Sequence, residues 1–176
     1  MKKLAIIIAV LLTLLIISIL LLRYYKKPPV SPTTSEIVSP PATIRESAMV
    51  AYVLDGDTIE IAGGRKVRLI GIDAPELNNK ENNPECFASQ SAHMTKQLLE
   101  GQTIELEKDK EDVDQYGRLL RYVYSDGVFI NEFLLRQGYG TKMAIKPNTK
   151  YYLLFAEAEK EAKENKRGLW KNCFTE

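Results

Sequence analysis

Residues Val50–Ile72 read VAYVLDGDTIEIAGGRKVRLIGI, and this stretch decides the fold. It holds three short runs that are rich in β-branched residues, at 50–53, 58–61 and 66–72. Turn sequences that contain Gly, at 55–56 and 63–64, separate the three runs. Runs of this kind between Gly-containing turns are typical of short strands. The stretch therefore predicts a three-stranded meander.

Further strand and helix patterns follow along the chain. Strands are predicted at 103–107 and 119–124, and helices over about 87–99, 131–137 and 149–166. A chain that begins with strands and adds helices late is typical of an α+β fold, in which helices pack on one side of a small β-barrel. We therefore expect the fold class α+β.

The first 27 residues differ from the rest of the chain. Apolar residues run from Leu4 to Leu22 with only Thr13 and Ser18 between them, which nearly spans a bilayer. No small-x-small cleavage sequence follows this run, so residues 1–27 predict an uncleaved transmembrane anchor. The alternative is a long signal peptide that is removed. Basic residues flank the run on both sides and do not decide its orientation.

Residues 28–47 hold five of the eight prolines of the chain, and they predict a semi-stiff linker of polyproline II character. Residues 48–176 form the predicted globular domain, which carries 18 Lys or Arg against 21 Asp or Glu, a net charge of −3. The whole chain has a net charge of +1, which excludes a strongly basic nucleic-acid-binding tail. A polyanion would therefore be bound by a few placed cations and not by a general basic field.

Two pairs of carboxylates stand at the ends of predicted strands. Asp55 and Asp57 precede the second strand, and Asp73 and Glu76 follow the third. Four acids in one place raise one another's pKa unless a cation is present, and oxygen ligands are those that Ca²⁺ and Mg²⁺ prefer. One His and two Cys are too few for a nitrogen or sulfur metal site, so any metal here is held by oxygen. An Asp-Gly-Asp sequence by itself is equally typical of an ordinary turn.

Two arginines accompany the acids. Arg68 lies in the stretch 67–72, where every other residue is apolar or Gly, so its guanidinium needs an anion. The strand alone leaves open whether it forms a structural ion pair or points into a charged site. Arg118 follows Gly117 at a strand start, where a single arginine is typical of solvated surface. Two guanidinium groups near an acid cluster nevertheless indicate phosphate chemistry, because they grip phosphoryl oxygens while carboxylates position water.

Four blocks of the chain resemble the staphylococcal nuclease (thermonuclease) family in their order and spacing. The blocks are 55–58, 68–76, 114–118 and 131–138, and the similarity extends over about residues 48–172. The resemblance implies a five-stranded OB-fold β-barrel with three helices. It also implies a Ca²⁺-dependent phosphodiesterase that acts on DNA and RNA and leaves 3′-phosphate ends. We expect a monomer without an obligate protein partner.

Matched position by position, the resemblance also assigns a metal site. Asp57 and Asp73 would ligate Ca²⁺ through their carboxylates, and Ala74 would ligate it through its backbone carbonyl. The reference enzyme has Thr in place of Ala74, but a carbonyl ligand does not depend on the side chain. Asp55 would support the metal site from behind.

The same resemblance assigns catalytic roles. Glu76 would activate or orient the attacking water, while Arg68 and Arg118 would bind the phosphate and stabilise the five-coordinate transition state. Arg118 would also be the proton donor to the leaving group. Tyr116 is retained and would bond to or stack on a terminal nucleotide, although packing explains a tyrosine beside a glycine turn equally well.

The sequence departs from the reference enzyme around the expected nucleotide. Met143 and Ile145 stand where that enzyme has two tyrosines, and Gln115 replaces a positive charge. We therefore expect a weaker or different grip on the substrate.

Cys86 opens the first predicted helix, and Cys173 lies beyond the last one. Some exported members of the family place cysteines similarly, so we predict a disulfide between them. Such a bond is worth about 4–5 kcal/mol in the chain-entropy model. Two free buried thiols are the alternative.

Two functions of different classes fit the sequence. The first is a membrane-anchored nuclease with its domain outside the cytoplasm, or a secreted one if the N-terminal segment is cleaved. The second is an OB-fold module that binds nucleic acid without catalysis. A module that only binds has no need of Glu76 beside the metal carboxylates, so the complete set of residues favours the enzyme.

Overall fold

The computed structural model describes residue 15 and the ranges 45–78 and 83–174. In this part five strands form a closed barrel: β1 (Arg45–Val53), β2 (Thr58–Ile61), β3 (Arg65–Leu69), β5 (Thr103–Glu107) and β6 (Leu119–Ser125). Neighbours are antiparallel in the order β3-β2-β1-β5-β6, and a parallel pairing of β3 with β6 closes the barrel. The predicted α+β fold with a five-stranded, OB-like barrel is confirmed.

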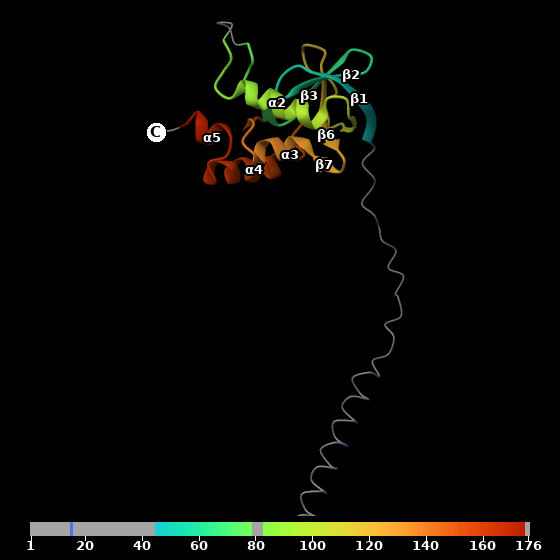
Figure 1. The fold of residues 1–176 in the computed structure, drawn as a ribbon. Helices are drawn as coiled ribbons and strands as arrows, with labels where there is room; N and C mark the ends of the chain where they lie inside the picture. Colours follow the sequence, from blue (N-terminus) through green and yellow to red (C-terminus); the bar gives the residue numbers. More distant parts are fainter. Residues whose placement is uncertain (1–14, 16–44, 79–82, 175–176) are drawn as a thin grey trace, which may run out of the picture. The chain divides into compact units, whose positions relative to one another are not determined.

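Three helices pack on the barrel, as predicted: α2 (Ala88–Leu99), α3 (Ile130–Arg136) and α4 (Tyr152–Glu164). Figure 1 shows α3 and α4 side by side below the strands. Smaller elements that the sequence patterns did not predict are β4 (Ile72–Asp73), β7 (Val128–Phe129), β8 (Thr141–Lys142) and α5 (Leu169–Asn172). The short strands β4 and β8 pair with each other as a separate two-stranded sheet.

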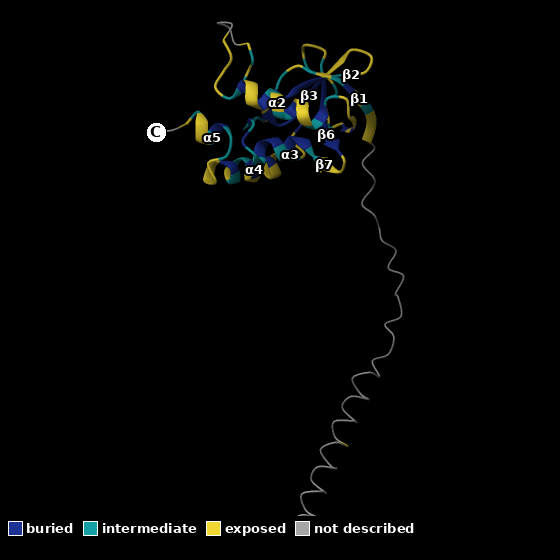
Figure 2. Cartoon of the chain, viewed as in Figure 1, coloured by how far each residue is buried: buried dark blue, intermediate teal, exposed yellow. Residues whose placement is uncertain are grey.

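The core fills the barrel and the space between its wall and the helices (Figure 2). All seven residues of β6 are buried, because this strand pairs with β5, β3 and β7. Asn131 joins the barrel to α3: its Oδ1 accepts from Val123 N at 2.8 Å, and its Nδ2 donates to Ile70 O at 2.8 Å. These bonds satisfy buried backbone groups that no strand partner reaches.

The third strand is shorter than the sequence predicts. The prediction ran it from 66 to 72, whereas β3 ends at Leu69 and the chain turns at Gly71 with φ +86°. A Cβ at Gly71 would lie 2.2 Å from a ring carbon of Phe155, so only glycine fits where the turn passes α4. The turn directs the following residues, from Ile72 onward, into the separate strand β4.

The N-terminal predictions fall almost entirely outside the described residues. The proposed anchor, 1–27, is described only at residue 15, and the predicted linker is described only from residue 45. No helix within the described residues is long and apolar enough to cross a membrane. Because β1 begins at Arg45, the last three residues of the range 28–47 belong to a strand and not to a linker.

A buried carboxylate ties the start of α4 to the barrel. Glu107 is fully buried, and it accepts hydrogen bonds from Tyr151 Oη at 2.9 Å, from Tyr124 Oη at 3.1 Å and from Lys150 Nζ. Burial acts to raise the pKa of the Glu107 carboxyl, but these hydrogen bonds outweigh it and hold the pKa below its ordinary value.

We predict that Glu107→Gln lowers the free energy of unfolding by roughly 2–3 kcal/mol at pH 7, because a buried hydrogen-bonded charge is removed from its partners. A carboxyl whose pKa is lower in the folded state than in the unfolded state stabilises the fold at pH values above its unfolded-state pKa. That stabilisation is lost as the pH falls through its folded-state pKa. The difference between the two proteins therefore shrinks in acid. Urea unfolding at several pH values measures it, with Glu105→Gln, on the same strand but half-exposed, as the control. Equal effects of the two substitutions would contradict the assignment.

Candidate active site

A pocket of ≈ 300 Å³ opens beside Arg68 and Asp73. It is lined by residues from three distant segments: Arg68, Asp73, Glu76, Asp114, Gln115, Tyr116, Arg118, Leu120, Met143 and Ile145. Five of the predicted site residues are among them, namely Arg68, Asp73, Glu76, Tyr116 and Arg118. The other three, Asp55, Asp57 and Ala74, do not line the pocket.

A buried ion pair lies behind this pocket. Arg68 Nη2 is 3.0 Å from Asp57 Oδ2, and the two side chains are 6% and 5% exposed. The fold brings them together because Asp57 directly precedes β2, in which Thr58 pairs with Arg68 of β3. Asp57 also accepts hydrogen bonds from Ala74 N at 2.8 Å and from Thr58 Oγ1 at 3.0 Å. The carboxylate therefore ties the 55–58 turn to the loop that follows β4.

The charge of Asp57 is not fully offset by its partners. Burial raises the pKa of the Asp57 carboxyl; Arg68 opposes the rise, whereas the neighbouring Asp55 adds to it. Asp55 itself accepts a hydrogen bond from Asp57 N at 3.0 Å, so it stands directly behind the buried acid. Burial and the charge of Asp55 thus disfavour the ionised form of Asp57 next to the pocket.

Gly56 allows the segments of the site to approach closely. A Cβ built on it would lie 2.2 Å from Ser91 Oγ of α2 and 2.5 Å from Ala74 Cβ. Thr95 of α2 also donates a hydrogen bond to Gly56 O at 2.8 Å. The glycine between the two aspartates is therefore required by packing against α2 and the Ala74 loop, in addition to its place in a turn.

Arg68 also fixes the turn that carries Asp73. Its Nη1 donates to Leu69 O at 2.8 Å and to Ile72 O at 2.6 Å, while its Nη2 lies 3.3 Å from Asp73 Oδ1. The Asp73 side chain is 52% exposed, in contrast to that of Asp57. The sequence left open whether Arg68 is structural or faces a charged site, and the structure combines the two: it holds the turn and lines the pocket.

The second arginine is held by an acid that the sequence analysis did not assign. Arg118 Nε donates to Asp114 Oδ2 at 2.7 Å, and Arg118 Nη1 approaches Thr58 Oγ1 at 3.4 Å. Because Thr58 donates to Asp57, a chain of contacts links the two guanidinium groups. Among the described residues, Arg118 Nη2 makes no hydrogen bond or ion pair, and it is left for an anion in the pocket.

Glu76 stands exposed at the rim of the pocket. Burial raises the pKa of its carboxyl, and the charges of Asp55 and Glu85 raise it further. Glu85 holds its backbone on both sides: Glu76 N donates to Glu85 Oε2 at 3.0 Å, and Glu85 N donates to Glu76 O at 2.9 Å. Glu85 thus holds the backbone at Glu76, and the pKa of the Glu76 carboxyl is raised above its ordinary value.

The candidate donors near the pocket are oxygen atoms, which hard divalent cations prefer. Asp57 Oδ2 and Asp73 Oδ1 lie 3.0 and 3.3 Å from the same Arg68 Nη2, so the two oxygens are no more than 6.3 Å apart. No His or Cys lines the pocket. The described ranges contain no group of three or more His, Cys, Asp or Glu that could hold a metal ion. The two carboxylates and the Ala74 carbonyl would therefore need water or substrate oxygens to complete the six to eight ligands of Ca²⁺.

The far wall of the pocket suits a nucleotide ring. Tyr116 is 75% exposed, and the Arg118 guanidinium lies 5.5 Å from its ring centroid. Met143 and Ile145 face the same space, in place of the two tyrosines of the reference enzyme. An exposed aromatic ring next to a cation is a stacking surface for a base, with softer apolar contacts around it.

Comparison with known proteins shows the family to which the chain belongs. A family model described as staphylococcal nuclease homologue matches residues 66–172. The chain belongs to the staphylococcal nuclease homologue family. The resemblance drawn from the four sequence blocks is thereby confirmed.

Several known proteins are similar to this chain. A thermonuclease of Staphylococcus intermedius is 36% identical over 128 residues, which is 71% of this chain and 76% of the relative. Endonuclease YncB of Bacillus subtilis is 38% identical over 66% of this chain. An uncharacterized protein of Bacillus anthracis is 40% identical over 69% of it. The match spans only 58% and 59% of these last two proteins, less than two thirds of their length.

The sequence analysis did not single out three residues that contact the site residues of this staphylococcal nuclease homologue: Thr58, Asp114 and Glu85. Thr58 and Asp114 lie inside two of the four blocks, so their position in those blocks could have indicated that they belong to the site. Glu85 lies outside every block, and its neighbour Cys86 was considered only as a disulfide partner.

The predicted disulfide between Cys86 and Cys173 is present.

Proposed function

We propose that the domain is a Ca²⁺-dependent nuclease that hydrolyses phosphodiester bonds in DNA and RNA and leaves 3′-phosphate ends. The observation that carries the proposal is the pocket in which Arg68, Arg118 and Glu76 face one space beside the carboxylate of Asp73. Membership of the staphylococcal nuclease homologue family and the similarity to a thermonuclease and an endonuclease support it.

In the proposed reaction Glu76 takes a proton from the water that attacks phosphorus. Negative charge then develops on the non-bridging oxygens, where the Arg68 and Arg118 guanidinium groups stabilise it. In this proposal the bond from phosphorus to the 5′-oxygen breaks, and Arg118 gives that oxygen its proton. Asp114 holds the Arg118 guanidinium, and Glu85 holds the backbone at Glu76, before the substrate arrives.

Asp57, Asp73 and the Ala74 carbonyl would hold the Ca²⁺ ion, with Asp55 behind them. When bound, the ion neutralises charge on the phosphodiester and on the surrounding acids. The raised pKa of the Asp57 carboxyl supports this assignment, because a bound cation would offset both the burial of this charge and the neighbouring charge of Asp55.

Substitution of the base and of the second arginine tests the catalytic roles. We expect Glu76→Gln and Arg118→Ala each to lower kcat on single-stranded DNA and on RNA by about 10²–10⁴. Glu157→Gln and Arg65→Ala, which are exposed and lie outside the pocket, serve as matched controls. Circular dichroism verifies the fold of each variant. Near-normal rates in either test variant would refute its role, and an inactive wild-type protein that still binds nucleic acid would favour the alternative of a binding module.

Removal of one carboxylate tests the metal site. We expect Asp73→Asn to weaken Ca²⁺ binding at least tenfold in isothermal titration calorimetry, because a hard cation loses an anionic ligand. Asp126→Asn, in the exposed turn between β6 and β7, removes the same charge away from the site and should leave the affinity unchanged. Chelation of Ca²⁺ should abolish cleavage. Full activity in chelator would overturn the metal requirement.

We also propose that residues 1–27 tether the nuclease to the membrane, with the domain on the extracytoplasmic side. Protease added to intact cells that make the full chain should then degrade the domain while a cytoplasmic marker survives. Survival of the domain until the cells are lysed would place it inside the cell, and recovery in the culture medium would indicate cleavage of the segment.

A further inference from the structure

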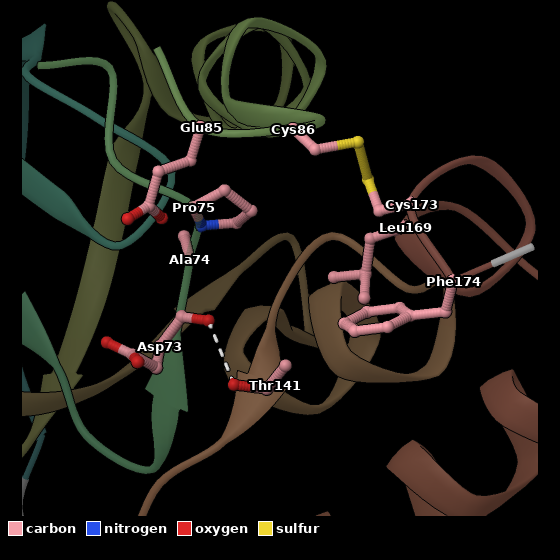
Figure 3. A pocket seen from close by; sticks show the side chains of 9 residues that line it. All are labelled: Asp73, Ala74, Pro75, Glu85, Cys86, Thr141, Leu169, Cys173 and Phe174. Carbon is pink, nitrogen blue, oxygen red and sulfur yellow. Dashed lines mark hydrogen bonds between the residues drawn. A yellow bond between two sulfur atoms is a disulfide. The ribbon is translucent and has the colours of Figure 1, made fainter. Parts of the chain in front are cut away.

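A second pocket adjoins the candidate active site. It measures ≈ 320 Å³, and Figure 3 shows its lining: Asp73, Ala74, Pro75, Glu85, Cys86, Thr141, Leu169, Cys173 and Phe174. Asp73 lines this pocket as well as the first one. A ligand that lies over Asp73 could therefore reach both pockets.

The walls of the second pocket combine apolar surface with hydrogen-bond acceptors. Pro75, Leu169 and Phe174 supply apolar surface, together with the disulfide (Figure 3). The Glu85 and Asp73 carboxylates, which only accept when ionised, supply polar edges. Two carboxylates disfavour a phosphate inside the pocket, whereas they match the N–H groups at the edge of a neutral ring.

Phe174 provides a supported aromatic face. Its side chain is 59% exposed, and its ring stacks on Trp170 with 4.9 Å between centroids and 22° between planes. The disulfide holds the preceding residue, Cys173, against the segment that carries Glu85. An exposed ring that is fixed in this way is a platform on which a nucleobase stacks.

We propose that this pocket binds the nucleobase on the other side of the scissile phosphate from the base that meets Tyr116. The inference rests on the proposed function, which places the phosphodiester beside Asp73. Successive nucleotides of a single strand then occupy the two pockets, and the phosphate between them lies at the arginines. A volume of ≈ 320 Å³ is at the lower end of the roughly 300–1,000 Å³ of ligand pockets, which suits one base and not an oligonucleotide.

Dinucleoside monophosphates test the inference, because each contains a single phosphodiester. One substrate carries adenine on both units, and two others carry an abasic unit on one side or the other. We expect one abasic substrate to lose about tenfold in kcat/KM relative to the complete dinucleotide, since stacking of one base is worth about 1–3 kcal/mol. Phe174→Ala should lower kcat/KM for the complete substrate by a similar factor. It should leave kcat/KM for that abasic substrate unchanged.

Tyr52→Ala is the matched control, because Tyr52 is 62% exposed and lines neither pocket. It should leave all three values of kcat/KM unchanged. Normal cleavage of every substrate by Phe174→Ala would overturn the second base site while the nuclease assignment stands.

Fluorescence of Trp170, the single tryptophan of the chain, gives a readout that needs no cleavage. In the Glu76→Gln variant with Ca²⁺, the complete dinucleotide should change the emission saturably, and the abasic substrate identified above should not. An emission change without any cleavage by wild-type protein would retain the base site and refute the nuclease. The same emission change with both abasic substrates would refute the base site.

Discussion

The ion pair between Arg68 and Asp57 is the interaction on which the rest of the site depends. Both side chains are buried, and a buried charge is tolerated only when it is paired and hydrogen-bonded. Arg68 meets this condition by binding the carbonyls of the turn after β3, and Asp57 meets it through Ala74 N and Thr58. Apolar residues of similar volume often stabilise a fold equally well. The pair therefore makes more sense as a device that fixes Asp73 and Ala74 next to the pocket than as a source of stability.

Much of the fold followed from local sequence patterns. The five barrel strands and three helices were predicted because β-branched runs, glycine turns and apolar helix faces act over a few residues. The boundary at Gly71 was missed because the contact that decides it, with Phe155, crosses more than eighty positions of sequence. The strand β8 was also missed, because within the described residues it pairs only with the two-residue strand β4, which lies far away in the sequence.

Part of the candidate pocket could be predicted from the sequence, because five of the assigned residues line it, but their different degrees of burial could not. The four acids looked alike in sequence, yet Asp57 is buried whereas Asp73 is half-exposed, because one lies behind Arg68 and the other lies in front of it. Thr58 has no chemical signature of its own, and its contacts with Asp57 and Arg118 appear only when β2 faces the 114–118 turn. Glu85 likewise has no signature in the sequence, and its contact with the Glu76 backbone appears only in the folded chain.

The disulfide connects two features that the sequence separates by 87 positions. Cys86 follows Glu85, which holds the backbone of Glu76, and Cys173 precedes Phe174, which borders the second pocket. This one covalent bond therefore neighbours the segment that holds Glu76, the proposed general base for the attacking water. It also neighbours the Phe174 ring, on which a nucleobase would stack. A bond whose only use was to restrict the unfolded chain could close a long loop at many surface positions. Its position here would link the proposed base-binding ring at Phe174 to the segment next to the proposed catalytic residue Glu76.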